Sequence, residues 1–250
     1  MYRNQRVAVV MPAYNAELTL RATYEEVRDQ GIVDDIILVD DGSRDGTVAL
    51  ARSLPGVTVH VHDRNLGYGG NQKTCYRLAL ARGADIVVMV HPDYQYTPKL
   101  IPALASMIAN GLHEFVIGSR ILGGFALQGG MPWWKYLANR FLTVAQNMLM
   151  GAKLSEYHTG YRAYSRKLLE SMRLDELSND FIFDNQFIAQ AIWHGCMIGE
   201  VSCPTKYFAE ASSINFRRSV VYGLGCLRVA SRFFLSRRLG FRAPRYLAAG

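Results

Sequence analysis

Short apolar runs alternate along this chain with stretches whose apolar residues recur at the spacing of an α-helix. The runs are five residues or shorter and are bounded by proline, glycine or aspartate, which is typical of buried parallel strands. They predict strands over 7–11, 36–39, 57–61, 86–90 and 115–117, and the helical spacing predicts helices over 18–27, 47–54, 76–81 and 100–108. This alternation predicts an α/β fold with a doubly wound, mostly parallel sheet flanked by helices.

The pattern changes after Gly118. A glycine-rich loop is expected over Gly123–Pro132 and a helix over Trp133–Met150. A second helix is expected over Asp184–Trp193 and a strand over Met197–Val201. We expect this half of the chain to complete the sheet.

The final segment, Phe216–Arg238, is interpreted as an amphipathic helical tail. At about 100° per residue, one sector of its surface holds Arg217, Arg218, Arg228 and Arg232. A neighbouring sector holds Phe216, Val220, Leu224, Leu227 and Phe234. Such a helix suits an anionic membrane surface, and the alternative is a helix that packs on the body of the protein or on another subunit.

The charge is distributed unevenly over the 250 residues. Eight of the 28 basic residues and none of the 21 acidic residues lie between Ala211 and Gly250. The rest of the chain therefore has 20 basic and 21 acidic residues, which argues against a broad nucleic-acid-binding face. No apolar run approaches the roughly 18–20 residues of a membrane span, and no signal peptide is visible. With no CxxC pair among the four cysteines, a reduced, cytoplasmic setting is expected.

Polar side chains follow the apolar run at 86–90. In an extended segment alternate side chains share one face, so His91, Asp93 and Gln95 are expected to converge just beyond the end of a strand. Ligands of open α/β sheets bind at that edge, and a divalent cation held there would neutralise a diphosphate. The alternative is a polar turn in which Asp93 caps the next helix.

Two more polar loops follow the first and second strands, Pro12-Ala13-Tyr14-Asn15-Ala16-Glu17 and Asp40-Asp41-Gly42-Ser43-Arg44-Asp45-Gly46-Thr47. The carboxylates of Asp40 and Asp41 can accept hydrogen bonds from a base or a ribose, and Tyr14 can stack on a base. The alternatives are that the aspartates form a turn and cap a helix, and that Tyr14 packs in the core.

Glycines occur in a different place from that of a dinucleotide-binding Rossmann enzyme, because the first loop lacks the Gly-x-Gly-x-x-Gly pattern. The later sequence Gly67-Tyr68-Gly69-Gly70 opens a predicted helix. It either lets the backbone approach a ligand closely or forms a tight entry from loop to helix.

The motifs PAYNAE, VDDGSRDGT, NLGYGGNQ, HPDYQY, GSR and HTGYRAY occur in the order found in family-2 glycosyltransferases of the GT-A fold. Over about residues 6 to 210 the chain resembles the dolichyl-phosphate mannose synthase type and its bacterial polyprenyl-phosphate relatives. The resemblance implies that the nucleotide is held by Pro12, Tyr14, Glu17, Val39 and Asp41. It also implies that Asp93 and Gln95 bind Mg²⁺ or Mn²⁺ with the donor diphosphate, and that Arg120 meets a phosphate.

Two positions depart from the family pattern. His91 stands where the first aspartate of Asp-x-Asp-x-Gln is usual, and imidazole suits Mn²⁺ better than Mg²⁺. The exchange removes a negative charge and weakens the expected metal site; alternatively, His91 only hydrogen-bonds the diphosphate. Ala16 stands where many relatives have glutamate, and Glu17 is the candidate to serve instead.

The mechanism implied by the resemblance is inversion by single displacement, in which an acceptor attacks the anomeric carbon of a nucleotide-sugar. A lipid phosphate is already anionic and needs cations rather than a strong base. The candidate cations are Arg120, Lys135, Arg140 and Arg162, with solvated surface charge as the alternative for Lys135 and Arg140.

A sugar hydroxyl as acceptor requires a general base. Asp184 is the candidate, with a helix N-cap as its alternative role. His158 is a second candidate, with a structural role as its alternative.

The leading hypothesis is a metal-dependent inverting glycosyltransferase that moves a sugar from UDP, GDP or dTDP to a polyprenyl phosphate at the cytoplasmic face of the membrane. The alternatives are transfer to a saccharide or another soluble acceptor, and a protein that binds a nucleotide-sugar or a partner without turnover. Residues 1–210 are interpreted as the catalytic domain, with a nucleotide-binding half at about 1–120 and an acceptor half at about 121–210, and residues 211–250 as the basic tail.

Overall fold

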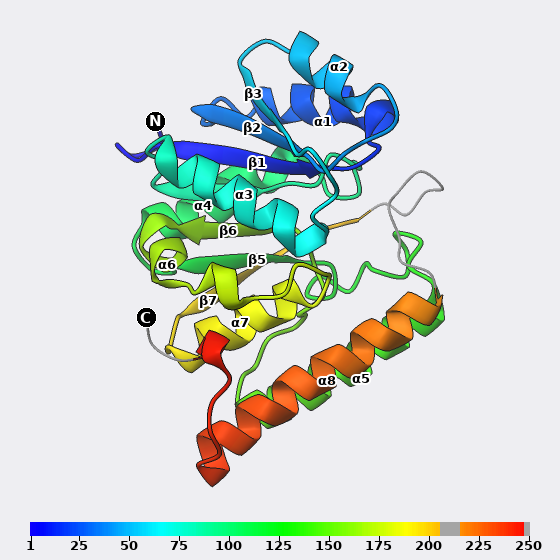
Figure 1. Ribbon diagram of the computed structural model, residues 1–250, viewed down its shortest axis with the longest axis vertical. Helices are drawn as coiled ribbons and strands as arrows, with labels where there is room; N and C mark the ends of the chain where they lie inside the picture. The colour runs from blue at the N-terminus through cyan, green and yellow to red at the C-terminus, as the bar shows by residue number, and fades with distance from the viewer. Residues whose placement is uncertain (206–215, 248–250) are drawn as a thin grey trace.

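The computed structural model describes residues 1–205 and 216–247, in which one mixed sheet carries helices on both faces (Figure 1). The strands are β1 (Val7–Ala13), β2 (Asp35–Asp40), β3 (Val57–Val61), β4 (Ile86–Met89), β5 (Phe115–Ser119), β6 (Arg162–Ser165) and β7 (Ile198–Ser202). They form a seven-stranded sheet in the order β3-β2-β1-β4-β6-β5-β7. Neighbouring strands are parallel except at β6, which runs antiparallel to both β4 and β5.

Helices cover the two faces of the sheet in two groups. One face is covered by α1 (Glu17–Arg28), α2 (Thr47–Ser53) and α4 (Ile101–Ala109). The other is covered by α3 (Tyr68–Ala81), α6 (Arg166–Ser171) and α7 (Phe183–Trp193). Along β1, alternate apolar side chains enter the two cores, because Ala8 and Val10 point to one face and Val9 to the other. The doubly wound architecture expected from the apolar runs is therefore confirmed.

Two long helices lie side by side beyond this layered core, α5 (Trp133–Met150) and α8 (Phe216–Leu239) (Figure 1). One side of α8 is buried in the core next to α7, through Val229, Ala230 and Phe233. The tail helix thus packs on the body of the protein, which was one of the two expected alternatives. Among the described residues, no helix combines the length and the hydropathy required to cross a bilayer.

The face that α8 buries differs from the apolar sector expected from the sequence. Val220 and Leu224 of that sector are 47% and 63% exposed. Arg218, Arg228 and Arg232 are exposed as well. The side chains of Phe216 and Arg217, and the expected domain boundary at residues 210 and 211, lie outside the described residues.

Most predicted elements are confirmed with ends that move by one or two residues. The helix expected over 76–81 begins eight residues earlier, at Tyr68, and the sequence did not predict β6 and α6. The strand β6 has four residues and begins with Arg162, which is fully buried. A strand that begins with a charged residue does not show the apolar run of a buried strand. The burial of that residue depends on partners that lie elsewhere in the chain.

Candidate active site

Three loops come together at one edge of the sheet because β1 lies between β2 and β4. Pro12 pairs with Val39 of β2, and Val10 pairs with Met89 of β4. All three strands are parallel, so the loops that follow them leave the same edge, which is where open α/β sheets bind ligands. The predicted juxtaposition of the first, second and third polar loops is present.

The first two loops are joined by hydrogen bonds from backbone amides. The amide of Asn15 donates to Ser43 Oγ at 2.8 Å, and the amide of Gly46 donates to Glu17 Oε2 at 2.8 Å. A Cβ at Gly46 would lie 2.4 Å from Glu17 Oε1, so only glycine leaves room for this carboxylate. Glu17, predicted to meet the nucleotide, therefore also ties the second loop to the start of α1.

The carboxylates of Asp40 and Asp41 are buried and hold the second loop in place. Asp40 Oδ1 accepts hydrogen bonds from the amides of Gly42 and Ser43, so the turn-forming alternative describes this side chain. Asp41 Oδ1 contacts His62 Nδ1 at 2.8 Å, and Asp41 Oδ2 accepts from the amide of Gly67 at 3.0 Å. Contact of either carboxylate with a base or ribose stays a prediction. It would use the lone pairs that do not accept hydrogen bonds from these partners.

The other residues expected around the nucleotide differ in how much surface they offer. The Tyr14 ring is 51% exposed, which excludes the core-packing alternative and leaves its face available for stacking. Pro12 and Val39 are buried. The carbonyl of Val39 accepts a hydrogen bond from Asn71 Nδ2 at 3.0 Å.

The third loop turns sharply after β4. Tyr94 has φ 54°, and Asp93 Oδ1 accepts the amide of Gln95 at 3.1 Å, which closes a turn. The helix-capping alternative for Asp93 is wrong, because the Thr97 hydroxyl caps the short 3-10 helix that follows. Asp93 thus retains carboxylate surface at the sheet edge, where it is partly exposed.

A divalent cation at this loop would find one imidazole, one carboxylate and one amide oxygen, from His91, Asp93 and Gln95. Within residues 1–205 and 216–247, no three His, Cys, Asp or Glu side chains gather into a metal site of their own. The donor set fits a cation that takes its remaining ligands from a diphosphate and water. Burial lowers the pKa of His91, although Asp93 and Asp184 act in the opposite direction, so the imidazole is neutral at pH 7.

The glycine-rich segment before α3 packs against the residues that precede α7 instead of forming an open phosphate loop. The amide of Gly69 donates to the Asn179 carbonyl at 2.7 Å. A Cβ at Gly67 would lie 2.6 Å from that carbonyl, and a Cβ at Gly69 would lie 2.4 Å from the Ser178 carbonyl. These glycines permit a close approach of two backbones, so the tight loop-to-helix entry is the alternative that the contacts support.

Arg162 and Asp184 form a buried ion pair that the sequence did not reveal. Arg162 Nη1 lies 3.1 Å from Asp184 Oδ1, and the side chains are 0% and 9% exposed. Burial alone would lower the pKa of Arg162, but Asp184 raises it above the ordinary value. Further guanidinium hydrogens go to the carbonyls of Tyr157, Thr159 and Asp184. Direct contact of Arg162 with a phosphate is therefore a prediction that this geometry contradicts.

Asp184 has further partners. Gln72 Nε2 lies 3.2 Å from Oδ1, and the Tyr68 hydroxyl donates to Oδ2 at 2.8 Å. Burial and the nearby Asp184 carboxylate raise the pKa of Tyr68. With both oxygens engaged and only 6% of the residue exposed, Asp184 is not placed as a free general base.

A second buried ion pair holds Arg120. Its Nε donates to Glu156 Oε1 at 2.8 Å, and Glu156 is fully buried. Burial by itself would raise the pKa of Glu156, but the Arg120 guanidinium overcomes this and lowers it. The Arg120 side chain is 11% exposed, and its contact with a phosphate stays a prediction.

His158 is fixed by hydrogen bonds at both ring nitrogens. Nδ1 lies 3.0 Å from the Tyr222 hydroxyl of α8, and Nε2 lies 3.3 Å from Gln146 Nε2 of α5. Burial lowers the pKa of His158 to about 4. The structural alternative for this histidine is the one that the contacts support.

Lys135 differs from the other candidate cations. Arg140 donates to the Ser155 carbonyl at 2.7 Å. Lys135 Nζ lies 5.5 Å from the Trp134 ring centroid, and among the described residues it forms neither a hydrogen bond nor an ion pair. Burial, and then the positive charge of Arg120, lower its pKa, which places two cations near one another. An anion between them would relieve this repulsion.

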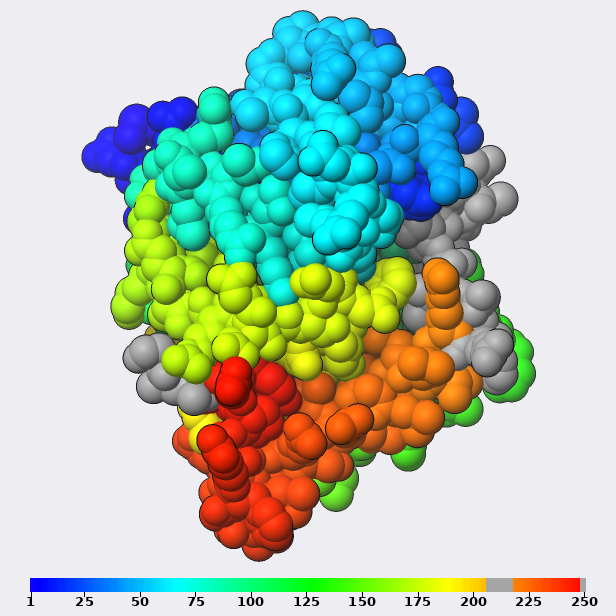
Figure 2. All heavy atoms as spheres, in the orientation of Figure 1, coloured from blue at the N-terminus to red at the C-terminus, as the bar shows by residue number. Residues whose placement is uncertain are grey.

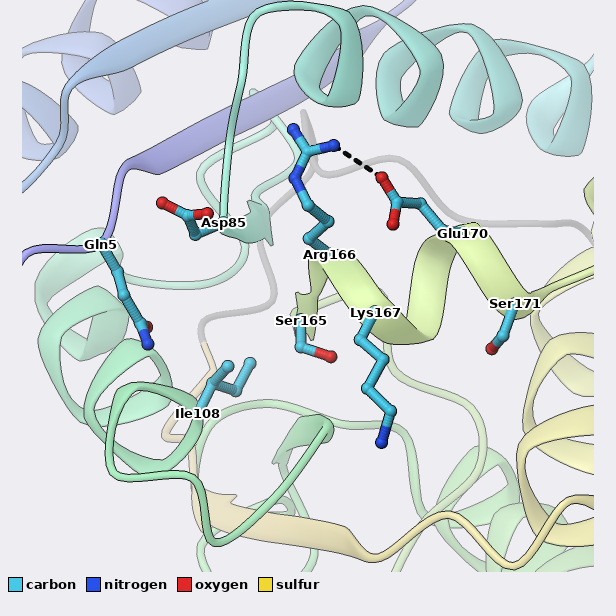
Figure 3. A pocket seen from close by; sticks show the side chains of 8 residues that line it. All are labelled: Gln5, Asp85, Ile108, Ser165, Arg166, Lys167, Glu170 and Ser171. Carbon is cyan, nitrogen blue, oxygen red and sulfur yellow. Dashed lines mark hydrogen bonds and ion pairs between the residues drawn. The ribbon is translucent and has the colours of Figure 1, made fainter.

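A hollow of about 570 Å³ lies elsewhere, and its position excludes it from this site (Figure 3). Its lining includes Gln5, Asp85 and Ser165. These residues precede β1 and β4 or end the antiparallel β6, so the hollow lies at the opposite edge of the sheet. Its prominent cation, Arg166, is paired with Glu170 (Figure 3).

Sequence reasoning missed three residues of the site, Tyr68, Gln72 and Glu156. Tyr68 and Gln72 lie inside the glycine-rich motif, in which the glycines and not these side chains indicate a function. Glu156 follows Ser155 in a loop and shows no periodicity. The sequence contains acids that could pair with these arginines, but it does not show which acid pairs with which arginine.

Comparison with known proteins identifies a family. A model of the family described as "Glycosyl transferase family 2" matches residues 8–173. The chain is 28% identical to the UDP-N-acetylglucosamine–dolichyl-phosphate N-acetylglucosaminyltransferase of Methanococcus voltae, over 89% of this chain and 96% of that protein. It is 30% identical to the polyprenol monophosphomannose synthase of Mycolicibacterium smegmatis, over 79% of this chain and 76% of that protein.

Solved structures show the same fold. The glucosyl-3-phosphoglycerate synthase of Mycobacterium tuberculosis superposes with a TM-score of 0.70 at 20% identity, over 94% of this chain and 80% of that one. That enzyme has been solved with UDP and Mn²⁺ and with UDP and Mg²⁺. At this identity the likeness concerns the arrangement of the strands and helices.

Proposed function

Since the chain belongs to glycosyltransferase family 2 and has its GT-A fold, we propose that it moves a sugar from a nucleotide-sugar to a polyprenyl phosphate with inversion. The donor is a UDP-, GDP- or dTDP-sugar. An oxygen of the acceptor phosphate forms the bond to the anomeric carbon, and the bond from that carbon to the donor diphosphate breaks. A divalent cation, bound by Asp93 with His91 and Gln95, would offset the charge of the leaving diphosphate.

The observation that carries the choice of acceptor is that neither candidate base among the described residues is free. Among the described residues, the two candidate bases are Asp184, whose oxygens accept hydrogen bonds from Tyr68 and Gln72, and His158, whose nitrogens are both engaged. A sugar hydroxyl must lose a proton as it attacks. A phosphate monoester is already ionised, so the engagement of both candidate bases favours it.

Cations for that phosphate are present on the acceptor side. Lys135 lies at the start of α5, near Arg120, and it is not neutralised by any described acid. Arg120 is paired with Glu156 and adds positive charge close to Lys135. Arg162 acts indirectly in this proposal, by holding Asp184.

The acceptor side also offers an apolar surface suited to a lipid. Along α5 the exposed apolar side chains are Trp133, Leu137, Phe141, Val144 and Met148. Their spacing of three or four residues places them on one face of the helix. Neither α5 nor α8 contains an acidic residue, and α8 adds exposed arginines, which complements an anionic leaflet. We place the protein at the cytoplasmic face of the membrane, with the α5 face toward the lipid.

A transfer assay tests this proposal. The protein would be given labelled UDP-, GDP- and dTDP-sugars with Mn²⁺ or Mg²⁺, and undecaprenyl phosphate, undecaprenol or a disaccharide as acceptor. We expect label to enter the organic phase with the lipid phosphate only. Lys135→Ala should raise the KM for that acceptor about tenfold, which corresponds to roughly 1.4 kcal/mol.

Lys153→Ala is the matched control, since Lys153 is exposed just beyond α5, and it should leave this KM unchanged. Equal transfer to the alcohol or to the disaccharide would contradict the proposed acceptor. Nucleotide-dependent stabilisation without transfer to any acceptor would favour a binding protein instead.

A further inference from the structure

The Tyr68 side chain links the metal loop to the buried ion pair. Its ring stacks on Phe181 with centroids 4.8 Å apart and faces the His91 ring at 5.6 Å and 16°. Its hydroxyl lies 2.8 Å from Asp184 Oδ2 and 3.3 Å from His91 Nε2. A Cβ at Gly160 would lie 2.5 Å from the same His91 nitrogen, so the imidazole is confined on two sides.

The hydrogen atoms in this chain of contacts can be assigned from their partners. Asp184 forms an ion pair with the Arg162 guanidinium, so its carboxylate oxygens only accept hydrogen bonds. The phenol of Tyr68 has one hydrogen, and the short contact directs it to Asp184 Oδ2. The contact between Tyr68 and His91 is then a hydrogen bond only if His91 Nε2 carries the donating hydrogen.

The opposite tautomer of His91 is disfavoured. It would require the Tyr68 hydrogen to point at His91 Nε2, which would leave Asp184 Oδ2 without its donor inside the protein. With the hydrogen on Nε2, a neutral imidazole carries its lone pair on Nδ1. In the part of the chain that the structure describes, Nδ1 of His91 has no hydrogen-bond partner, and the side chain is partly exposed.

We propose that Tyr68 is a positioning residue for the metal site: together with Asp184 it fixes His91 as the Nε2–H tautomer, so that Nδ1 serves as a ligand of the cation bound by Asp93. This inference rests on the proposed function. Histidines that bind metals commonly donate their other N–H to an outer partner, which sets the tautomer and the ring orientation. An imidazole ligand also favours Mn²⁺ over Mg²⁺.

The role of Asp184 changes with this assignment. Asp184 acts through Tyr68 on His91 and, with Arg162, joins the acceptor half to the donor half. Replacement of Asp184 would therefore disturb metal binding even if the acceptor needs no base. Loss of activity in an Asp184→Asn variant would not, for this reason, distinguish a saccharide acceptor from a lipid phosphate.

Tyr68→Phe tests the inference because it removes only the hydroxyl and keeps the ring between Phe181 and His91. Mn²⁺ binding in the presence of UDP, GDP or dTDP would be followed by the electron paramagnetic resonance of free Mn²⁺. We expect Tyr68→Phe to weaken Mn²⁺ binding about 10- to 100-fold. Nucleotide binding without metal should be unchanged.

Tyr24→Phe is the matched control. Tyr24 is buried on α1, and its hydroxyl also donates one hydrogen bond, to the Pro55 carbonyl. We expect its Mn²⁺ affinity to equal that of the original protein. Melting curves of both variants would show whether each is folded.

Two further measurements separate positioning from packing. Electron spin-echo modulation of bound Mn²⁺ should reveal a coordinated imidazole nitrogen in the original protein, and this signal should disappear in His91→Ala. In the His91→Ala background, Tyr68→Phe should cost no additional Mn²⁺ affinity.

The inference is overturned if bound Mn²⁺ shows no nitrogen modulation, or if Tyr68→Phe weakens Mn²⁺ binding equally with and without His91. Either result would leave the proposed function intact, provided that Mn²⁺ and a nucleotide still bind together. Failure of the original protein to bind any nucleotide with Mn²⁺ would reject the proposed function itself.

Discussion

The donor half and the acceptor half of this molecule hold their charges in different ways. On the donor side, Asp40 and Asp41 are met largely by backbone amides of the loops that follow them. On the acceptor side, Arg162 pairs with Asp184, 22 residues away in the sequence, and Arg120 pairs with the buried Glu156, 36 residues away. Around the site, backbone amides thus hold the donor-side carboxylates, whereas buried ion pairs hold the acceptor-side arginines.

This difference implies different energetic consequences of mutation. A hydrogen bond within a loop contributes about 0.5–1.5 kcal/mol to stability. Removal of one partner from a buried ion pair costs about 3–5 kcal/mol, because the other charge is left without compensation. We therefore expect the acceptor side of the site to be the more sensitive to single substitutions.

The largest effect is expected from Arg162→Met. Methionine has a similar length, but it leaves the Asp184 carboxylate buried without its cation. We expect the free energy of unfolding to fall by about 3–5 kcal/mol, measured by urea denaturation.

Ser43→Ala is the comparison on the donor side, since it removes a hydroxyl bonded to Asp40. It should cost about 1 kcal/mol. Equal losses for the two variants would remove the distinction between the halves.

An intermediate effect on the free energy of unfolding is expected when the pH is lowered. The pKa of His158 is about 4 in the folded protein, against about 6.5 in an unfolded chain. The unfolded state therefore binds a proton that the folded state refuses, and stability falls as the pH drops from about 6.5 towards 4. From this histidine we expect a loss on the order of 3 kcal/mol over that range.

His158→Gln should make the dependence of unfolding free energy on pH shallower in this window. His91, whose pKa is also lowered, would leave a residual slope. His194→Gln is the control, because His194 is exposed, and it should change nothing. An unaltered slope in His158→Gln would show that His158 accepts its proton in the folded state.

The smallest effect on stability is expected on the outer face of α5. Leu137 and Phe141 are 61% and 64% exposed, so Leu137→Ser with Phe141→Ser should change the unfolding free energy by less than about 0.5 kcal/mol per site. Binding to vesicles that contain anionic lipid should nevertheless fall at least about tenfold, as apolar contact with the bilayer is lost.

The matched double variant is Leu112→Ser with Met197→Ser, whose side chains are 60% and 63% exposed before β5 and β7. It should bind vesicles as the original protein does.

In the view of Figure 2 the atoms of α8 form much of the lower part of the surface, with α5 behind them. A change of oligomeric state without a change in vesicle binding would identify the α5 face as a contact between subunits.

Much of the donor side could be predicted because its signals are local. Pro12, Asp41 and His91 each lie within two residues of the end of an apolar strand, and the parallel order of the strands brings such ends together. The resemblance to a family then supplied the expected partner of each loop. Even so, the buried state of Asp40 and the hydrogen bond from Gly67 to Asp41 were not visible in the sequence.

The acceptor side was harder to predict for a physical reason. Arg162 was expected at a phosphate, and it is instead a fully buried residue of β6. Asp184 was expected as a base, and it is the partner of that arginine. A lone charged residue in a sequence has the same appearance whether it faces solvent or a buried counter-charge.

The amino-acid sequence by itself determined the alternation of strands and helices, the edge at which three polar loops meet, and the family. Those properties follow from apolar periodicity and short motifs, which act over a few residues. Only the tertiary structure decided that Tyr68 joins His91 to Asp184, that Arg120 forms an ion pair with Glu156, and which face of α8 is buried. Pairing of buried charges depends on which distant segments the fold brings into contact, because a charge leaves water only where a partner compensates it.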